Sequence, residues 1–174
     1  MNFIEVCSGC GGLSQGFIDA GFCPLLLNEI DKVFCETLRL NHPTAHLQCG
    51  DMNKLDLTPY KGQVDVLMGG VPCQSFSQAG MRKGLEDKRG DLIIKFKELI
   101  DQCDPKIFLI ENVKGLLTHD KGNTIAKVIN NLNSNHNYKI SYKLLNAVNY
   151  EVPQKRERVI IIGIRKDLGL EAVG

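Results

Sequence analysis

The chain has 174 residues, of which 43% are hydrophobic and 24% charged, and this balance suits one soluble globular domain. No apolar run approaches the length of a membrane span, and residues 1–5 have no basic region before their apolar residues, so neither a membrane anchor nor a secretory signal is expected. The net charge of +1 does not by itself indicate nucleic-acid binding, so any such surface must be local.

The seven cysteines are odd in number and follow no regular spacing. This pattern argues against a disulfide framework and for the reducing cytoplasm. Cys7 and Cys10 form a Cys-x-x-Cys pair, but no second pair follows, so a zinc site is not expected. The histidines also show no ligand spacing and are expected to be structural or surface residues: His42, His46, His119 and His136. We therefore expect a cytoplasmic protein without a metal.

The first predicted elements are a strand over 2–7, a turn Gly9-Cys10-Gly11-Gly12 and a helix over 13–20. Strand, glycine-rich turn and helix in this order are the plan of a mononucleotide-binding unit. Glycines let a ligand approach the backbone, and the amino terminus of a helix adds a favourable dipole. Because the next glycine is Gly16, the spacing is not Gly-x-Gly-x-x-Gly, which disfavours a nicotinamide-dependent enzyme.

Acidic residues follow the next two predicted strands. The strand over 25–27 leads to Glu29, about 20 residues past the glycine turn, where a ribose-hydroxyl acceptor stands in this kind of sheet. The alternative is that Glu29 is a carboxylate at the amino terminus of the helix predicted over 33–40. The weaker strand over 46–49 is followed by Asp51, which the residues alone predict to be a helix cap.

The strand predicted over 64–68 leads into Gly69-Gly70-Val71-Pro72-Cys73. Pro72 fixes its own φ and favours extended geometry at Val71, so Cys73 is held at a strand-to-loop junction. Ligands bind at the carboxyl ends of strands in an open α/β sheet, so a nucleophile there faces the crevice. A cysteine taken alone is more commonly a small buried thiol. Its flanking Pro, Gln, Ser and Phe favour the nucleophile here.

A long, glycine-punctuated loop over 78–90 comes next and carries four basic and two acidic residues. Loops of this length inside a compact domain are usually functional lids or disordered segments. With a nucleophile at its base and positive charge on its body, this loop fits one that contacts phosphates and closes over an extruded base. The alternative is a solvated surface loop.

The second half of the chain is predicted to contain helices over 92–103 and 122–132 and strands over 106–110, 138–148 and 159–164. The strand over 106–110 is apolar after its first residue, as expected in a buried parallel sheet, and it ends at Glu111. The alternation within 138–148 indicates an outer position in the sheet.

A basic cluster, Gln154-Lys155-Arg156-Glu157-Arg158, precedes the last predicted strand. Such a cluster is usually a solvated face. Alternate residues of an extended segment share a face, however, so Arg156 and Arg158 can both point into one cleft.

Pro72-Cys73-Gln74-Ser75-Phe76-Ser77 resembles the nucleophile motif of the DNA cytosine-5 methyltransferases of bacterial restriction–modification type. The glycine turn resembles that family's S-adenosylmethionine loop, and 78–90 its catalytic loop. Glu111-Asn112-Val113 resembles the motif whose Glu binds the target cytosine, and Gln-x-Arg-x-Arg resembles motif VIII. The resemblance covers nearly the whole chain as an amino-terminal catalytic part. It implies an α/β, doubly wound, mostly parallel Rossmann-like sheet of seven strands, forming one incomplete domain over 1–174.

The resemblance also implies S-adenosylmethionine as the cofactor. Glu29 then binds the ribose hydroxyls, Asp51 contacts the adenine amino group, and Met52 lies against the ring. Cys7 stands where the family often has a Phe packed near the cofactor, so this contact differs here. The residues expected to bind the cofactor are Cys7, Gly9, Gly11, Gly12, Glu29, Ile30, Asp51, Met52, Pro72 and Leu92.

The implied reaction is methyl transfer to C5 of a cytosine in DNA. Addition of the Cys73 thiolate to C6 makes C5 an enamine carbon that can attack a sulfonium methyl. Glu111 can hydrogen-bond or protonate N3, for which its carboxyl pKa must be raised by burial, while Arg156 and Arg158 bind O2 and position Cys73 and Glu111. No side-chain base for the C5 proton is evident, and an ordered water can serve.

C6 is buried in a duplex, so the base must be flipped out. The residues expected to contact double-stranded DNA are Gln74, Ser75, Ser77, Arg82, Lys83, Lys88 and Arg89.

Two other classes stay open. One is methylation of cytosine in tRNA, against which the DNA-type context of Cys73 argues. The other is an inactive fragment or binding subunit of a split enzyme. In the family, a target-recognition domain lies downstream, and a far carboxyl-terminal segment completes the cofactor pocket. We expect both to be missing here, so the chain alone should fold but not methylate duplex DNA without a second chain.

Overall fold

The computed structural model describes residues 1–72 and 92–170. The strands are β1 (Asn2–Val6), β2 (Cys23–Glu29), β3 (Leu47–Cys49), β4 (Val66–Gly69), β5 (Ile107–Val113), β6 (Tyr138–Asn146) and β7 (Glu157–Arg165). The α-helices are α1 (Gly12–Asp19), α2 (Lys32–Asn41), α4 (Leu92–Cys103), α5 (Gly115–Thr118) and α6 (Asn123–Leu132). The 3₁₀ helices are η1 (Met52–Lys54), η2 (Thr58–Tyr60), η3 (His119–Gly122), η4 (Ala147–Tyr150) and η5 (Lys166–Leu168). None of the helices in the described ranges is long and apolar enough to cross a membrane.

The described strands form one seven-stranded sheet in the order β3-β2-β1-β4-β5-β7-β6. β1 pairs in parallel with β2 and β4, β2 pairs in parallel with β3, and β6 pairs with β7 in antiparallel orientation. The expected α/β fold with a mostly parallel, seven-stranded sheet is confirmed. The outer position expected for 138–148 is confirmed as well, because β6 is an edge strand.

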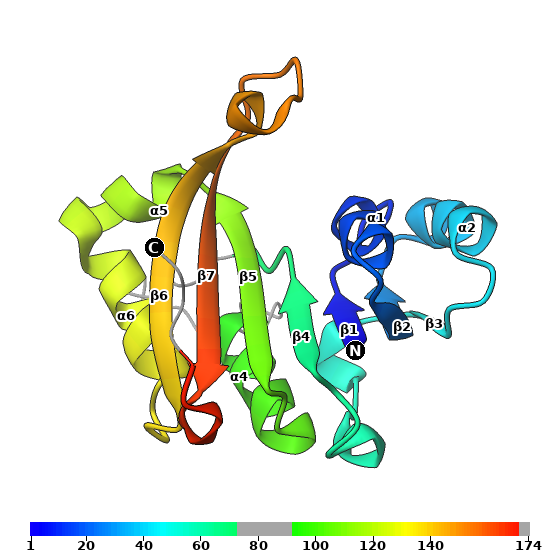
Figure 1. Cartoon of the computed structure of the whole chain (residues 1–174), viewed down its shortest axis with the longest axis horizontal. Helices are drawn as coiled ribbons and strands as arrows, with labels where there is room; N and C mark the ends of the chain where they lie inside the picture. The colour runs from blue at the N-terminus through cyan, green and yellow to red at the C-terminus, as the bar shows by residue number, and fades with distance from the viewer. Residues whose placement is uncertain (73–91, 171–174) are drawn as a thin grey trace, which may run out of the picture. The chain divides into compact units, whose positions relative to one another are not determined.

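The chain divides into two compact units, whose elements can be followed by colour in Figure 1. Unit 1 comprises residues 1–70 and 98–108, and unit 2 comprises residues 71–97 and 109–174. Unit 1 therefore contains β1 to β4 with α1 and α2. Unit 2 contains most of β5 together with α6, β6 and β7.

The core of unit 1 forms around β1, whose Phe3, Ile4 and Val6 are fully buried. The ring of Phe17 on α1 packs against Phe3, with ring centroids 5.8 Å apart. Helix α2 begins where it does because the Asp31 carboxylate accepts hydrogen bonds from two backbone N–H groups of its first turn. This packing fixes the turn between β1 and α1, on which the predicted cofactor site depends.

The core of unit 2 forms from alternating residues of its strands and one face of α6. Ile110, Val159 and Ile161 are buried on the strands, and Val128 and Leu132 are buried on α6. In Figure 1, α6 lies behind β6. The helical spacing of its buried residues explains why 123–132 folds as an amphipathic helix against these strands.

Two boundary differences concern the predicted site. Strand β5 continues to Val113, so Glu111 lies within the strand rather than beyond its end. Strand β7 begins at Glu157, so Arg158 is also a strand residue. The short helix α5 was not predicted, since four residues are too few to show helical periodicity.

The structure corrects the expectation from the cysteine pattern at one pair. Cys35 of α2 and Cys49 of β3 form a disulfide across a sequence separation of 14 residues, with their Cα atoms 6.0 Å apart. Helix α2 packs against β3, and only that packing brings the two residues together. The other described cysteines are free: Cys7, Cys10, Cys23 and Cys103.

Candidate cofactor and catalytic sites

The glycine turn of unit 1 requires glycine at one position and leaves the backbone sterically open at two others. Gly11 has a φ of +84°, and a Cβ there would lie 2.7 Å from the Nε2 atom of His42, so only glycine fits. Gly9 also has a positive φ, but a Cβ at Gly9 or Gly12 would meet no atom within 4 Å. A ligand can therefore approach the backbone at Gly9, as the sequence predicted for this turn.

The Glu29 carboxylate organises the end of β2. Its Oε2 atom accepts a hydrogen bond from Gly9 N at 2.7 Å, and its Oε1 atom accepts from Ile30 N at 2.8 Å and Asp31 N at 2.9 Å. Glu29 is only 6% exposed, and Asp31 rather than Glu29 caps α2. A carboxylate offers about four lone-pair sites, so one stays available for a ligand hydroxyl.

The segment after β3 is tied to the end of β2. The Asn28 side-chain amide donates to the carbonyls of Gln48 and Gly50, both at 3.0 Å, and Gly50 N donates to the carbonyl of Glu29 at 2.7 Å. Asp51 caps η1 by accepting from Asn53 N, as predicted from the residues alone.

Cys7 and Met52 meet within unit 1. The Cys7 thiol points at the Met52 sulfur at 3.9 Å, and Met52 is 3% exposed. Burial raises the pKa of the Cys7 thiol to about 12, with further contributions from Glu29, Glu5 and Asp51. Cys7 is therefore a neutral thiol at physiological pH, in surroundings that favour a positively charged ligand.

Glu5 is a buried acid that the sequence analysis did not identify. It is 2% exposed on β1, and its carboxylate accepts a hydrogen bond from the Ser14 hydroxyl of α1. Burial raises the pKa of Glu5 to about 7 against the opposing effect of the Ser14 hydrogen bond, and Glu29 raises it further. The available signal was a single carboxylate between the apolar residues Ile4 and Val6 of β1.

Unit 2 contains the second predicted cluster. The Arg158 Nε atom lies 2.8 Å from the Glu111 Oε1 atom, and an Nη atom of Arg156 lies 3.7 Å from the same oxygen. The side chains of Glu111 and Arg158 are each 27% exposed, and that of Arg156 is 51% exposed. Both arginines therefore approach the same carboxylate oxygen, while the cleft into which they were expected to point stays a prediction. Glu111 is less buried here than the sequence argument expected.

Asn112 is a positioning residue that the sequence analysis quoted without giving it a role. Its side-chain amide donates to the Val71 carbonyl at 2.8 Å, across 41 residues of sequence, and Asn112 is 7% exposed. Val71 is fully buried and directly precedes Pro72. Strand β5 thus presents Glu111 on one face and, from the other, fixes the backbone two residues before Cys73.

The structure brings the predicted residues together in two separate sets. Unit 1 gathers Cys7, Gly9, Gly11, Glu29, Ile30, Asp51 and Met52 around the ends of β1, β2 and β3, and unit 2 gathers Glu111, Arg156 and Arg158. Pro72 and Leu92 belong to unit 2, and their roles at the cofactor stay predictions. The predictions for Cys73, Gln74, Ser75, Ser77, Arg82, Lys83, Lys88 and Arg89 lie outside the described residues.

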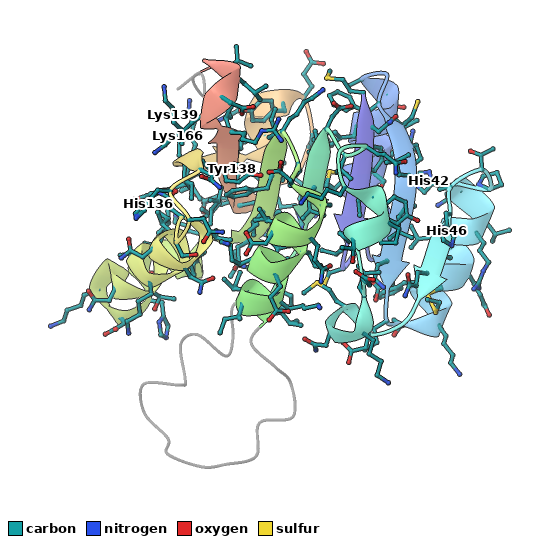
Figure 2. The ribbon with its side chains drawn as sticks, turned by 90° about the horizontal axis from the view of Figure 1, so that it is seen from below. His42, His46, His136, Tyr138, Lys139 and Lys166 are labelled. Atoms are coloured by element: carbon teal, nitrogen blue, oxygen red, sulfur yellow. A yellow bond between two sulfur atoms is a disulfide. The ribbon has the colours of Figure 1, made fainter. Side chains whose placement is uncertain are left out.

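The histidines have structural surroundings. His42 is buried beneath Gly11, and the His46 ring is 3.2 Å from the Tyr60 hydroxyl. In unit 2, His136 lies near Tyr138 and Lys139 at the start of β6 (Figure 2). Within residues 1–72 and 92–170, no group of three or more His, Cys, Asp or Glu side chains is placed to hold a metal ion.

The sheet order, the glycine turn and the acidic ends of β2 and β3 define a Rossmann-like protein of the methyltransferase type. The family model for C-5 cytosine-specific DNA methylase matches residues 1–173, and the chain belongs to this family.

Two relatives are type II methyltransferases. The chain is 46% identical to M.Eco47II from Escherichia coli over 95% of this chain and 40% of that protein. It is 47% identical to M.PspPI from Psychrobacter sp. (strain TA137) over 96% of this chain and 40% of that protein. The chain therefore spans about 40% of the length of these curated relatives.

Solved structures give the same picture of the fold. A candidate DNA modification methyltransferase encoded within an E. coli prophage matches 99% of this chain and 49% of its own, with a TM-score of 0.82 and 32% identity. A Spodoptera frugiperda DNMT2 variant matches 98% of this chain and 52% of its own, with a TM-score of 0.80 at 24% identity, which shows the fold alone.

Proposed function

We propose that this chain is the cofactor-binding and catalytic part of an enzyme that methylates C5 of cytosine in double-stranded DNA, as the modification enzyme of a restriction–modification system. The observation that carries the proposal is the double role of β5. Glu111 on this strand is paired with Arg158, and the neighbouring Asn112 holds the backbone two residues before Cys73. Strand β5 thus positions both the carboxyl group of Glu111 and the backbone that leads to Cys73, within a single unit.

In this mechanism the Cys73 thiolate adds to C6 of a flipped-out cytosine, and the displaced electron pair moves toward N3 and O2. Glu111 donates a hydrogen bond or a proton to N3, while Arg158 and Arg156 stabilise the developing charge at O2. Bound S-adenosylmethionine supplies the electrophilic methyl group. Loss of the C5 proton to water then allows the bond between Cys73 and C6 to break.

The residues of unit 1 fit S-adenosylmethionine by the chemistry of their donor set. The open backbone at Gly9 and the remaining lone pair of Glu29 suit the ribose hydroxyls. Asp51 and Met52 suit the adenine amino group and ring. The negative charge of Glu29 and Asp51 favours a cationic sulfonium ligand over an anionic one.

The rest of an active enzyme must come from polypeptide beyond these residues, as part of a longer protein or as a second chain. The open face of unit 2 supports this. Leu109, Ile160 and Ile162 alternate along β5 and β7 on the same face as Glu111 and Arg158, and each is partly exposed. Figure 1 shows no described helix of unit 2 in front of β5, β7 and β6. We propose that an apolar segment of the remaining polypeptide covers this face.

The test is incorporation of labelled methyl groups from S-adenosylmethionine into duplex DNA and, in parallel, into tRNA. It compares the chain alone with the chain completed by its remaining polypeptide, either as one longer protein or as a second polypeptide from the adjacent reading frame. The proposal predicts C5-methylcytosine in DNA only with the completed protein, and none with Cys73→Ser. Methylation of tRNA but not of DNA would show that the substrate is tRNA and would contradict the proposed DNA substrate. Robust methylation of DNA by the chain alone would contradict the proposed need for further polypeptide.

A further inference from the structure

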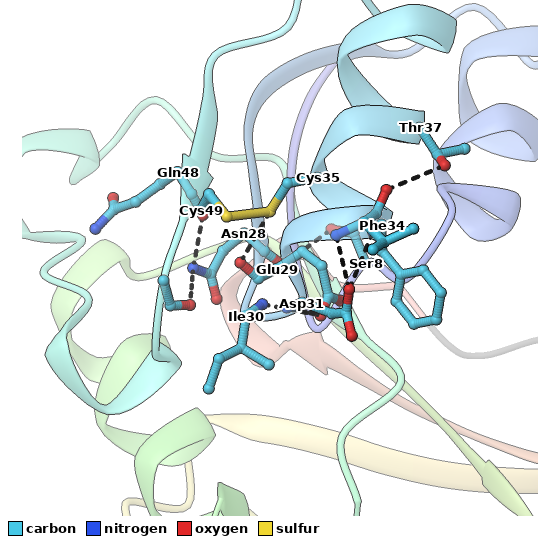
Figure 3. The surroundings of a disulfide bond; sticks show 12 residues. Ser8, Asn28, Glu29, Ile30, Asp31, Phe34, Cys35, Thr37, Gln48 and Cys49 are labelled. Carbon is cyan, nitrogen blue, oxygen red and sulfur yellow. Dashed lines mark hydrogen bonds between the residues drawn. A yellow bond between two sulfur atoms is a disulfide. The ribbon is translucent and has the colours of Figure 1, made fainter.

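The disulfide between Cys35 and Cys49 lies at the proposed cofactor site (Figure 3). Cys49 is the last residue of β3 and directly precedes Gly50-Asp51-Met52, the segment proposed to bind adenine. The Cys35 sulfur lies 3.4 Å from the Glu29 carbonyl oxygen, which also accepts the hydrogen bond from Gly50 N. The disulfide therefore joins α2 to the point where the ends of β2 and β3 meet.

Without this covalent bond, residues 50–52 would be held only by non-covalent contacts and a short strand. β3 has three residues and lies at the edge of the sheet, with β2 as its one paired neighbour. Short edge strands belong to the least stable parts of a protein. Its other ties include the Asn28 hydrogen bonds to Gln48 and Gly50, the hydrogen bond from Gly50 to Glu29, and the packing of the buried Met52 side chain against Cys7.

The two cysteine residues differ in exposure. Cys49 is exposed, whereas Cys35 is fully buried beside it. A soluble disulfide reagent can therefore reach Cys49 first, and Cys35 then stands ready to resolve the mixed disulfide. Disulfides in reducing compartments are usually transient and redox-sensing rather than permanent.

We propose that Cys35 and Cys49 are a thiol–disulfide modification site that controls the order of residues 50–52 and, through it, cofactor affinity. The effect on cofactor affinity rests on the proposed function. A thiolate at Cys49 attacks glutathione disulfide, forming a mixed disulfide and releasing one glutathione thiol. Cys35 then attacks the Cys49 sulfur, which forms the intramolecular bond and releases the second glutathione. Two electrons pass to glutathione disulfide, and its two thiols receive the two protons.

The oxidised form should bind S-adenosylmethionine more tightly, because the tie fixes Asp51 and Met52 before the ligand arrives. Coupling between sites is typically at least about fivefold in affinity, and this is the difference we expect between the two redox forms. Because such coupling is reciprocal, bound cofactor should also raise the fraction of protein with the disulfide at a given glutathione ratio.

The experiment equilibrates the protein, completed by its remaining polypeptide, with reduced or oxidised glutathione. It then measures the disulfide by mass spectrometry after thiol blocking, S-adenosylmethionine affinity by titration calorimetry, and amide hydrogen exchange over residues 50–53. The inference predicts a Cys35–Cys49 disulfide in oxidised glutathione, slower exchange over 50–53, and a dissociation constant lowered by roughly fivefold or more. Cys49→Ser should lose all three responses. Cys23→Ser, which removes a free and exposed cysteine of the same unit, should keep them.

Two results would overturn the inference: absence of the disulfide in oxidised glutathione, or equal exchange and equal affinity in both redox forms. If neither form bound S-adenosylmethionine, the proposed function would be contradicted instead. The exchange over residues 50–53 would then still decide the inference, and equal rates in both forms would overturn it.

Discussion

Two carboxylates, Glu29 in unit 1 and Glu111 in unit 2, follow similar apolar strands in the sequence but have different surroundings. Glu29 is 6% exposed and accepts hydrogen bonds from three backbone N–H groups. Glu111 has a side chain 27% exposed and is paired with the guanidinium groups of Arg156 and Arg158. Backbone donors cannot leave, whereas long side chains can change rotamer. This difference suits Glu29 to fixed binding of a ligand and Glu111 to exchanging partners during a reaction.

The largest effect is expected at Glu111. In the enzyme completed by its remaining polypeptide, Glu111→Gln should lower the rate of methyl transfer by roughly two to four decades, the range for a general acid–base group. Affinity for S-adenosylmethionine should stay nearly unchanged. Single-turnover kinetics and calorimetry measure the two quantities separately.

Glu157→Gln is the matched control for Glu111, because it removes a neighbouring carboxylate of β7 whose salt bridge, to Lys114 at 3.0 Å, is a surface pair. Exposed ion pairs contribute about 0 to 1 kcal/mol, so this variant should keep most of the activity. If Glu111→Gln lost cofactor binding as severely as a Glu29 variant, the two carboxylates would have been given the wrong roles.

The glycine turn, in which Gly9 N donates to Glu29, should not tolerate a side chain at position 11. Gly11→Ala adds a Cβ at a φ of +84° and 2.7 Å from His42, so it should destabilise the protein by about 3 kcal/mol through backbone strain and overpacking. Gly12→Ala is the control, because no atom lies within 4 Å of its added Cβ. Equal midpoints of denaturant unfolding for the two variants would contradict this account of the turn.

Glu29→Gln should act mainly on the cofactor. The amide keeps one acceptor oxygen, but its NH₂ group then faces one of the backbone donors. The ligand hydroxyl also loses a hydrogen bond to a charged acceptor, worth about 1.5 to 3 kcal/mol, so affinity for S-adenosylmethionine should fall by roughly one to two decades. Calorimetry checks the affinity, and circular dichroism checks that the fold is intact. If Glu29→Gln instead lowered the rate at saturating cofactor and left the affinity unchanged, Glu29 would act in the reaction rather than in cofactor binding.

The last prediction concerns the buried acid Glu5 and the pH dependence of folding stability. Because burial in the folded protein raises the pKa of Glu5 to about 7 from its ordinary value of 4.5, the folded state binds more protons than the unfolded state between these values. The contribution of Glu5 to stability is therefore lost as pH rises from 4.5 to 7 and stays lost above, by roughly 3 kcal/mol.

Glu5→Gln should remove that part of the pH dependence, because the amide stays neutral and can still accept the Ser14 hydrogen bond. The variant should be more stable than the parent at pH 8 and similar to it at pH 4.5 in denaturant unfolding. A parent protein whose stability rises between pH 5 and 7 by an amount that Glu5→Gln abolishes would have the opposite sign and contradict the assignment.

The sequence predicted what depends on local pattern. Glycine punctuation after an apolar strand located the turn at Gly9–Gly12, and the acidic residue at the end of the next strand located Glu29. Alternation in an extended segment put Arg156 and Arg158 on one common face. Each of these inferences rests on residues within one strand or turn.

What the sequence did not predict depends on distant packing. The bond from Asn112 to Val71 joins residues 41 apart, and the Cys35–Cys49 disulfide depends on how α2 lies on β3. The burial of Glu5 follows from which face of β1 meets α1. These features leave no local periodicity in the sequence. A carboxylate such as Glu5 is expected at the surface, and the cysteine pattern argued against a disulfide, so both expectations were opposite to what the structure shows.

The most direct test of the central claim is covalent trapping of Cys73. Duplex DNA containing 5-fluorocytosine is incubated with S-adenosylmethionine and the completed enzyme, and the denaturant-stable adduct is mapped by peptide mass spectrometry. Fluorine cannot leave C5 as a cation, so elimination should stall with the DNA attached to the peptide that contains Cys73, and Cys73→Ser should give no adduct. An adduct on another cysteine, or one that persists in Cys73→Ser, would contradict the account.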